Sequence, residues 1–561
     1  MLNKRLWLIL FIGIAVFYLW GLGSVPFVGP DEPRYAQVAR EMLAHRELIT
    51  PVLGGFPWFE KPVLLYWIVM ASYSVFGIGE YAARLGPAIC GLLIGALVYW
   101  IGSSIESASR SGDASSKESE TQRDGLGRFT ALIWLSSAGP LVFSRGVNFD
   151  ILLTLALTGA FACFFIWHVR YGTPTKRKGI NPASPALKYF LVGFYFFVGL
   201  SLLAKGLIGI IIVPGVIISY FVIRREWPAK KFLISLLWGI PLALAVAAIW
   251  YGPMLNRHGL VFIYQFFIQH HYRRFISNQY HHPQAFYFYV PVLAGLVIPW
   301  TIFLVAAFVS SRRWHWRGAS AVDRLRVFGF VWILAPVVFF SISQSKLPAY
   351  ILPVLPAAAL LVGERVTCFL REQRGQRVLR LTGALLLLAV AIGGVPLHRH
   401  YGLSVSVIAI AAAPLVAVAL TALARPQMGP ALYVLIAVAM FVTSAFSLKA
   451  VAPTIARRET VRDLLTAAAA RGFDTTPLVQ LHNVDRTAEF YGASQLIRGG
   501  DREPIKLQGV AEVAAVAQYR GGLILCLVPI EFESQLTTYR SVQTEVIGNN
   551  GSTSLVVVRA P

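Results

Sequence analysis

The run LWLILFIGIAVFYLWGL at residues 6–22 follows Lys4 and Arg5 and carries no charged side chain. About 20 apolar residues are enough to cross the hydrocarbon core of a bilayer. Because no small-residue cleavage site follows the run, we expect an uncleaved first membrane span that enters from the cytoplasm. Further apolar runs bring the predicted number of spans to about thirteen; they lie at 81–101, 129–144, 150–169, 188–204, 206–223, 232–252, 285–309, 327–343, 349–367, 379–396, 402–424 and 431–449.

The composition of the 561-residue chain points the same way, with 56% hydrophobic residues, 14% charged residues and a mean hydropathy of +0.62. Soluble domains usually contain about 25% charged residues, so an ordinary water-soluble enzyme is excluded. A disordered chain is excluded because such chains are poor in apolar residues. The four cysteines show neither a metal-ligand nor a redox spacing.

Basic residues outnumber acidic ones by 50 to 27, which gives a net charge of +23. In a soluble protein this excess would indicate nucleic acid as a partner. In so apolar a chain it indicates basic loops that orient the protein in a lipid bilayer, and no nucleic acid partner is expected.

Basic clusters lie in four successive alternate loops, at 176–178, 224–231, 312–317 and 371–377. Loops rich in Lys and Arg stay in the cytoplasm. These loops share a side with the N-terminus, so we expect a multi-pass protein whose N-terminus is cytoplasmic. Thirteen spans place the tail on the opposite, outer side.

Two domains are predicted, a membrane domain at 1–450 and a tail at 451–561. The membrane domain includes external loops at 23–80 and 253–284, and the short apolar stretch Pro62–Phe76 is expected to lie along the interface. In the tail, charged residues return and short β-rich runs alternate with helix-like stretches. The predicted fold is an all-α polytopic membrane protein with a small C-terminal α/β domain. No Gly-rich phosphate loop or metal spacing assigns chemistry to that tail.

Ionisable residues gather in the predicted external segments, where charge beside a membrane indicates function. Each has an ordinary explanation as well: Asp31 can cap a helix that starts near Pro33, and Lys61 can snorkel from an interfacial segment. Together they place carboxylates and cations on one side of the bilayer. The candidates are Asp31, Glu32, Arg34, Tyr35, Glu60, Lys61, Asp150, Lys205, His271, Arg274, Lys346 and Tyr350.

This mixture of side chains suits one kind of chemistry. Lys, Arg and Tyr bind a phosphate and stabilise the negative charge that develops on it as it leaves. A carboxylate beside them can take a proton from an attacking hydroxyl. A phosphate at a membrane surface belongs naturally to a lipid. The residues therefore predict transfer of a group from a lipid phosphate carrier to a hydroxyl acceptor.

A series of motifs runs through most of residues 1–365: PDEPRYAQVAREML at 30–43, WFEKP at 58–62, NFD at 148–150, AKG at 204–206, IQHHYRRF at 268–275, YHHPQAFYFYVPV at 280–292 and SKLPAYILPVLPAAALL at 345–361. In order and spacing, the series resembles the bacterial aminoarabinose lipid A transferases. These are membrane-embedded, protein O-mannosyltransferase-like glycosyltransferases with the GT-C fold. The remaining spans and the tail fit the layout of that family only loosely.

The resemblance implies roles for single residues. Asp31 would be the catalytic carboxylate near the acceptor, and the donor would be a sugar on undecaprenyl phosphate, attacked with inversion. The positions that hold the carrier phosphate correspond to Lys61, Arg274 and Tyr350. Other polar residues of the cavity correspond to Arg34, Tyr35, Asp150 and Lys205, and their neighbours Glu32 and Lys346 are expected in the same cavity.

The resemblance also associates Glu60 and His271 with positions where zinc occurs in some members. One carboxylate and one imidazole are too few for a closed tetrahedral zinc site, so zinc stays an open alternative and no other cofactor is expected. The chain departs from the relatives at Trp58, where they carry Tyr, and at His270-His271, where they carry Glu-His. These departures concern the choice of sugar and acceptor.

The expected function is an inverting glycosyltransferase that moves a sugar, such as aminoarabinose, from a polyprenyl phosphate carrier to lipid A or another envelope glycan or lipid. The resemblance places it at the periplasmic face of the bacterial inner membrane. One alternative is a protein O-mannosyltransferase-like enzyme. Another is a transporter or flippase of lipid-linked sugars, although transporters tend to place ionisable groups at the bilayer midplane. A third makes the tail a binding module that the spans anchor.

Overall fold

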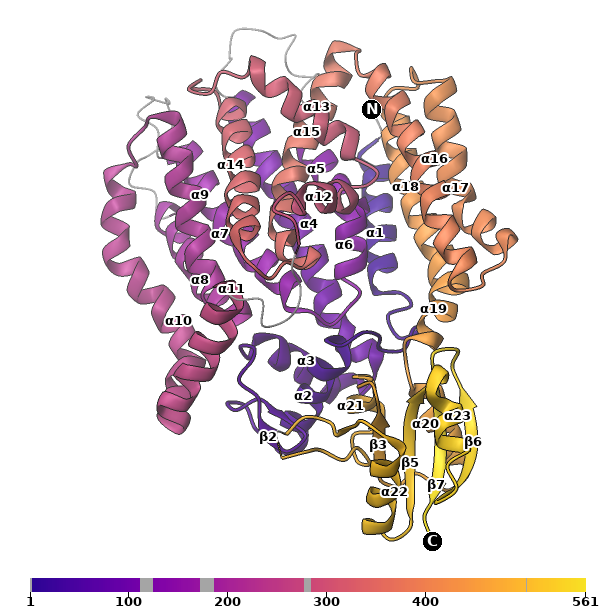
Figure 1. The fold of residues 1–561 in the computed structure, drawn as a ribbon. Helices are drawn as coiled ribbons and strands as arrows, with labels where there is room; N and C mark the ends of the chain where they lie inside the picture. Colours follow the sequence, from indigo (N-terminus) through magenta and orange to yellow (C-terminus); the bar gives the residue numbers. More distant parts are fainter. Residues whose placement is uncertain (1–2, 111–124, 172–185, 277–283, 501) are drawn as a thin grey trace.

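The computed structural model describes residues 3–110, 125–171, 186–276, 284–500 and 502–561, and it is mostly helical (Figure 1). Most of the chain forms a long helical bundle. Two other segments, residues 20–79 and the tail, lie together at one end of this bundle. The helices of the bundle are α1 (Lys4–Leu19), α4 (Glu80–Arg110), α5 (Leu126–Ser136), α6 (Ala138–Phe143), α7 (Phe149–Tyr171), α8 (Ala186–Lys205), α9 (Ile208–Arg224), α10 (Lys230–Phe262), η2 (Ile263–Arg273), α11 (Arg274–Ile276), α12 (Tyr289–Leu296), α13 (Thr301–Ser310), η3 (Ser311–Arg313), α14 (Ala321–Ile342), η4 (Pro348–Val354), α15 (Leu355–Glu372), α16 (Gln376–Arg399), α17 (Val405–Ala424), α18 (Pro430–Phe446), η5 (Ser447–Val451) and α19 (Ala452–Arg458).

Within the described residues, nine helices are long and apolar enough to cross a membrane, or ten if the pair α12 and α13, bent by 119°, counts as one span. Each of the nine overlaps a predicted span, so a multi-span helical membrane protein is confirmed. The bent pair falls on the run at 285–309. The other three predicted runs, at 6–22, 129–144 and 206–223, form shorter helices. The run at 129–144 is divided because Ser137 adopts an extended conformation between α5 and α6.

The helix α10 is longer than the sequence predicts. The span was expected to end at residue 252, but α10 continues to Gly259, since the residues that follow 252 are still largely apolar, and η2 then runs to Arg273. At Gly259, with φ of 52°, the chain turns back, and η2 packs against α10, where the ring centres of Trp250 and Phe266 lie 5.9 Å apart. At 1.5 Å per residue, the 30 residues from Lys230 to Gly259 extend about 45 Å, which exceeds the roughly 30 Å of a hydrocarbon core. Its far end therefore projects beyond the bundle, as Figure 1 shows.

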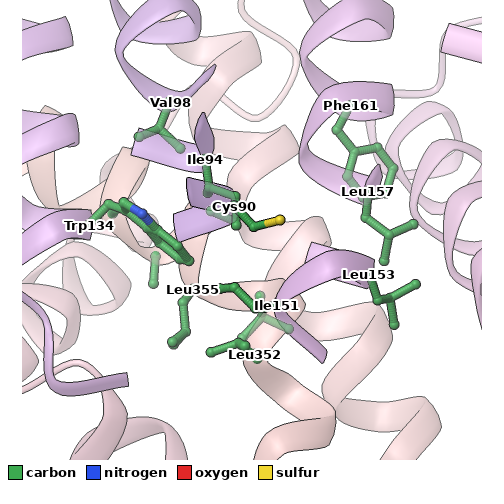
Figure 2. Close-up of a cluster of buried hydrophobic side chains, with 14 of the residues drawn as sticks. Cys90, Ile94, Val98, Trp134, Ile151, Leu153, Leu157, Phe161, Leu352 and Leu355 are labelled. Carbon is green, nitrogen blue, oxygen red and sulfur yellow. The ribbon is translucent and has the colours of Figure 1, made fainter. Parts of the chain in front are cut away.

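The centre of the bundle is α7, which is buried along almost its whole length. Figure 2 shows one part of this core, where α4, α5, α7 and the segment around Leu352 and Leu355 meet. The indole Nε1 of Trp134 donates to the carbonyl of Gly91 at 2.9 Å, so this polar group is satisfied inside the bundle. Helices associate in a bilayer mainly by such close packing and internal hydrogen bonds. The packing fixes the start of α7, where Asp150 lies.

The first segment at the end of the bundle comprises residues 20–79. Its helix α2 (Glu32–Ala44) packs on α3 (Leu64–Phe76), and a short hairpin of β1 (Val52–Leu53) and β2 (Phe56–Pro57) connects them. The apolar α3 has 13 residues, about 20 Å, which is too short to cross a bilayer.

The second segment at this end is the tail, which contains a five-stranded sheet of order β4-β3-β5-β7-β6. Strands β4, β3 and β5 are parallel, and β7 runs antiparallel to both β5 and β6. Apolar clusters cover the two faces of the sheet. The elements are α20 (Arg462–Ala470), β3 (Leu478–Leu481), α21 (Ala488–Tyr491), β4 (Lys506–Leu507), α22 (Val510–Tyr519), β5 (Leu523–Pro529), η6 (Ile530–Phe532), α23 (Glu533–Thr537), β6 (Gln543–Asn549) and β7 (Thr553–Arg559).

Candidate active site

A cavity of about 590 Å³ lies where the first segment meets the bundle. Part of its wall is apolar and includes Ile208 and Ile211 of α9 and Phe339 and Phe340 of α14. The other part collects most of the predicted site residues. Those that line it are Asp31, Glu32, Tyr35, Glu60, Lys61, Asp150, Lys205 and Tyr350.

Asp31 directly precedes α2, but its side chain does not cap the helix. The carboxylate instead accepts a hydrogen bond of 2.8 Å from Arg34, and its side chain is 51% exposed. Arg34 is held in turn by its Nε, which donates to the carbonyl of Pro30 at 2.7 Å. The prediction that Asp31 simply caps the helix is therefore wrong. Its carboxylate faces the cavity and is accessible.

A line of alternating charges runs from Asp31 along the cavity wall. After Arg34 comes Glu60, at 4.0 Å from the guanidinium, and Lys61 Nζ lies 3.0 Å from the other oxygen of Glu60. Burial lowers the pKa of Arg34, but the carboxylates of Glu60 and Asp31 raise it more. Burial, with Asp31 and Glu60, raises the pKa of Tyr35 well above its usual value, so its phenol stays protonated.

The cavity wall carries a second charged group, formed by Asp150 and Lys205. Lys205, the last residue of α8, forms an ion pair with Asp150 in the first turn of α7, where the helix dipole favours an acid. The ammonium also lies 4.7 Å from the centre of the Tyr350 ring, a cation–π contact. Asn148 accepts from the amide of Ile151 at 3.0 Å and so starts α7 at this point. Three helical elements thus meet around Lys205.

Glu32 lines the cavity, but its bonds show mainly a structural role. Both carboxylate oxygens accept from Arg84 at 2.7 Å, and the amides of Val28 and Val147 also donate to this carboxylate. Arg84 donates further to the carbonyls of Leu22, Val25 and Pro26. The pair therefore ties the loop before Asp31 to the first turn of α4.

Replacing Arg84 by Met is expected to lower the free energy of unfolding by about 3–5 kcal/mol, because Glu32 would stay largely buried without its partner. Chemical denaturation of the purified protein in detergent measures the change. Arg399→Met, at an exposed position at the end of α16, is the matched control. Equal unfolding free energies of the two variants would contradict the role of Arg84.

Four predicted residues are not among those that line the cavity, although one of them, Arg34, contacts the lining residues Asp31 and Glu60. Lys346 is buried and donates to the carbonyl of Ser343 at 2.6 Å, and it is not one of the lining residues. The side chains of His271 and Arg274 lie outside the part of the chain that the structure describes, as do residues 176–178 and 280–283. Their neighbours His270, Tyr272 and Phe275 line the cavity.

The described residues do not form a zinc site. Nowhere among them do three His, Cys, Asp or Glu side chains come together as metal ligands. The carboxylate of Glu60 is engaged by Lys61 and lies near Arg34. Even with His271 added, two donors would be short of the four that zinc usually takes.

The sequence of residues 5–111 matches a family model described as dolichyl-phosphate-mannose-protein mannosyltransferase. Relatives from Yersinia enterocolitica and Pseudomonas paraeruginosa, both named undecaprenyl phosphate-alpha-4-amino-4-deoxy-L-arabinose arabinosyl transferase, are 29% and 28% identical to the chain. The alignments cover 66% and 69% of this chain but only 61% and 65% of the relatives. The chain thus spans less than two thirds of the length of these relatives.

The crystal structure of ArnT from Cupriavidus metallidurans bound to undecaprenyl phosphate superposes with a TM-score of 0.75, at 22% identity, over 99% of this chain and 98% of ArnT. The predicted resemblance to aminoarabinose transferases is confirmed. The archaeal oligosaccharyltransferase AglB from Archaeoglobus fulgidus superposes less closely, with a TM-score of 0.51 at 13% identity, over 94% of this chain and 70% of AglB. At these sequence identities the superpositions show only that the folds are shared. The chain has the fold of ArnT.

Sequence reasoning missed two features of this site. Arg84 lies in the first turn of an apolar span, and a charged residue there is a costly exception that could have been noticed. The residues of α9 and α14 that form the apolar wall could not be told from other span residues by their sequence, because they are equally apolar. The other members of the site were found because charged residues in external segments stand out against an apolar chain.

Proposed function

We propose that the protein is an inverting glycosyltransferase that moves a sugar from a polyprenyl phosphate, of the undecaprenyl type, to a hydroxyl group of lipid A or another envelope glycan or lipid. The observation that carries this proposal is the cavity with two kinds of wall. Its charged wall suits a sugar phosphate, and its apolar wall at α9 and α14 suits the first part of a lipid chain. Names of the relatives support aminoarabinose as the sugar.

In the proposed reaction, the acceptor oxygen attacks the anomeric carbon from the face opposite the phosphate. Asp31 takes the proton of the acceptor hydroxyl. The bond between the anomeric carbon and the phosphate oxygen breaks, and its electrons leave with the phosphate, so the configuration inverts. Lys61, Arg274 and Tyr350 stabilise the charge on the leaving polyprenyl phosphate. Asp150 and Lys205 hold Tyr350 in place.

The proposed location is the bacterial inner membrane, with thirteen spans, a cytoplasmic N-terminus and the cavity and tail on the periplasmic side. The basic clusters support this orientation. Arg224 and Arg225 close α9, whose other end lies at the cavity, and Arg371 lies at the far end of α15. Lys and Arg at that end belong on the cytoplasmic side.

A protein O-mannosyltransferase-like enzyme is the second candidate, favoured by the family-model match at residues 5–111. The two candidates share the donor chemistry and differ in the acceptor. Incubating the purified protein with a radiolabelled polyprenyl-phosphate sugar and an envelope extract separates them. Label in the glycolipid fraction is expected, label in protein would favour the second candidate, and label that stays on the carrier would contradict both.

A further inference from the structure

A tyrosine of the tail is hydrogen-bonded to the loop that carries Asp31. Tyr491, at the end of α21, accepts a hydrogen bond from the amide of Phe27 at 2.8 Å. Its hydroxyl donates to Glu80, the first residue of α4, also at 2.8 Å. Arg462 lies 3.5 Å from the same carboxylate. Burial and the neighbouring Glu80 raise the pKa of Tyr491, so the hydroxyl remains a donor. One phenol therefore joins the tail, the loop and a membrane span.

Aromatic packing surrounds this hydrogen bond. The ring of Phe27 is fully buried and lies edge-on to Phe490, with ring centres 4.7 Å apart. The guanidinium of Arg84 lies 5.2 Å from the centre of the Phe27 ring. Arg40 of α2 donates to the carbonyl of Phe490 at 3.2 Å. Phe27 is thus held between the bundle and the tail, four residues before Asp31.

The tail also reaches the second loop of the cavity. Arg498 packs against Gly54 so closely that a side chain at Gly54 would collide with it, and Gly54 has a positive φ of 63°. The guanidinium of Arg502 lies 5.1 Å from the centre of the Phe56 ring. This hairpin leads directly to Glu60 and Lys61. Both parts of the first segment that supply charged groups to the cavity therefore contact the tail.

We infer that the tail positions the catalytic loop, and that Tyr491 is the positioning residue through which it sets the place of Asp31. This inference rests on the proposed function. Tyr491 is not one of the residues that line the cavity, and it acts through the backbone of Phe27. The tail is then a part of the catalytic unit and not a separate binding module.

The test replaces Tyr491 by Phe, which keeps the ring and removes both hydrogen bonds of the hydroxyl. We expect kcat for transfer to fall about tenfold, the factor that a lost hydrogen bond is worth, because the loop that carries Asp31 loses its bond to the tail. KM for the donor should change less than about twofold, since Tyr491 does not line the cavity in which Lys61 lies. Hydrogen–deuterium exchange should show faster exchange in the 22–31 segment. Tyr519→Phe, at an exposed position on α22, is the matched control and should behave as wild type.

The two measurements separate the possible failures. Wild-type kcat in Tyr491→Phe, whatever the exchange, would overturn the inference, as would a lower kcat with unchanged exchange in 22–31. If the wild-type protein transfers no sugar, the proposed function fails. In that case, unchanged hydrogen–deuterium exchange of residues 22–31 in Tyr491→Phe would still show that Tyr491 does not hold the loop. Faster exchange would support its positioning role.

Discussion

Replacing Asp31 by Asn is expected to lower kcat for sugar transfer by about 10³-fold, within the range for loss of a general base. Asn has nearly the same shape and can still accept the hydrogen bond that Arg34 donates, so the loop should keep its structure. It cannot take a proton from the acceptor hydroxyl. Binding of undecaprenyl phosphate should stay close to wild type, because the groups assigned to the phosphate are unchanged.

The measurement is the initial rate of transfer from a labelled polyprenyl-phosphate sugar, together with equilibrium binding of the carrier. Asp474→Asn, at an exposed position in the tail, is the control for the substitution itself. A transfer rate in Asp31→Asn equal to that of the control would remove Asp31 from the catalytic role.

Replacing Lys61 by Gln should have the second largest effect. Loss of one group that stabilises a developing charge typically costs about 10²-fold in kcat. Lys61 lines the cavity and pairs with Glu60 at 3.0 Å, so its removal also leaves the carboxylate of Glu60 to repel the carrier phosphate. We therefore expect a lower kcat together with weaker binding of undecaprenyl phosphate, in contrast to Asp31→Asn.

Two further variants sharpen this test. Lys61→Arg keeps the positive charge and should recover most of the carrier binding. Lys230→Gln, at an exposed position at the start of α10, removes a lysine outside the cavity and should leave the rate unchanged. Carrier binding by Lys61→Gln as tight as that of Lys230→Gln would show that Lys61 does not hold the phosphate.

The sequence predicted the spans well because an apolar run of sufficient length has few alternatives in a folded chain. The predicted bounds were wrong where the length of a helix depends on its packing in the folded protein. The run at 129–144 is broken at Ser137, and α10 continues past residue 252. Neither feature has a strong local signal, since serine is tolerated in membrane helices and the largely apolar residues after 252 do not mark where the helix ends.

The sequence predicted the charged residues that line the cavity, but it did not predict how they are arranged there. Asp31, Lys61 and Lys205 were found because charge is rare in this chain, and the structure brings them to one cavity. The roles that the resemblance gives them stay predictions. The contact between Phe27 and Tyr491 joins residues 464 positions apart, and nothing in the local sequence marks either aromatic residue as more than core.

The central claim is that this protein adds a carrier-borne sugar to an envelope lipid or glycan. Mass spectrometry of envelope glycolipids tests it most directly, with extracts from cells that contain the wild-type protein, Asp31→Asn or no copy of the protein. We predict a glycolipid, lipid A in the first instance, that carries one additional sugar only in cells with the wild-type protein. Identical glycolipid profiles in all three extracts would contradict the account.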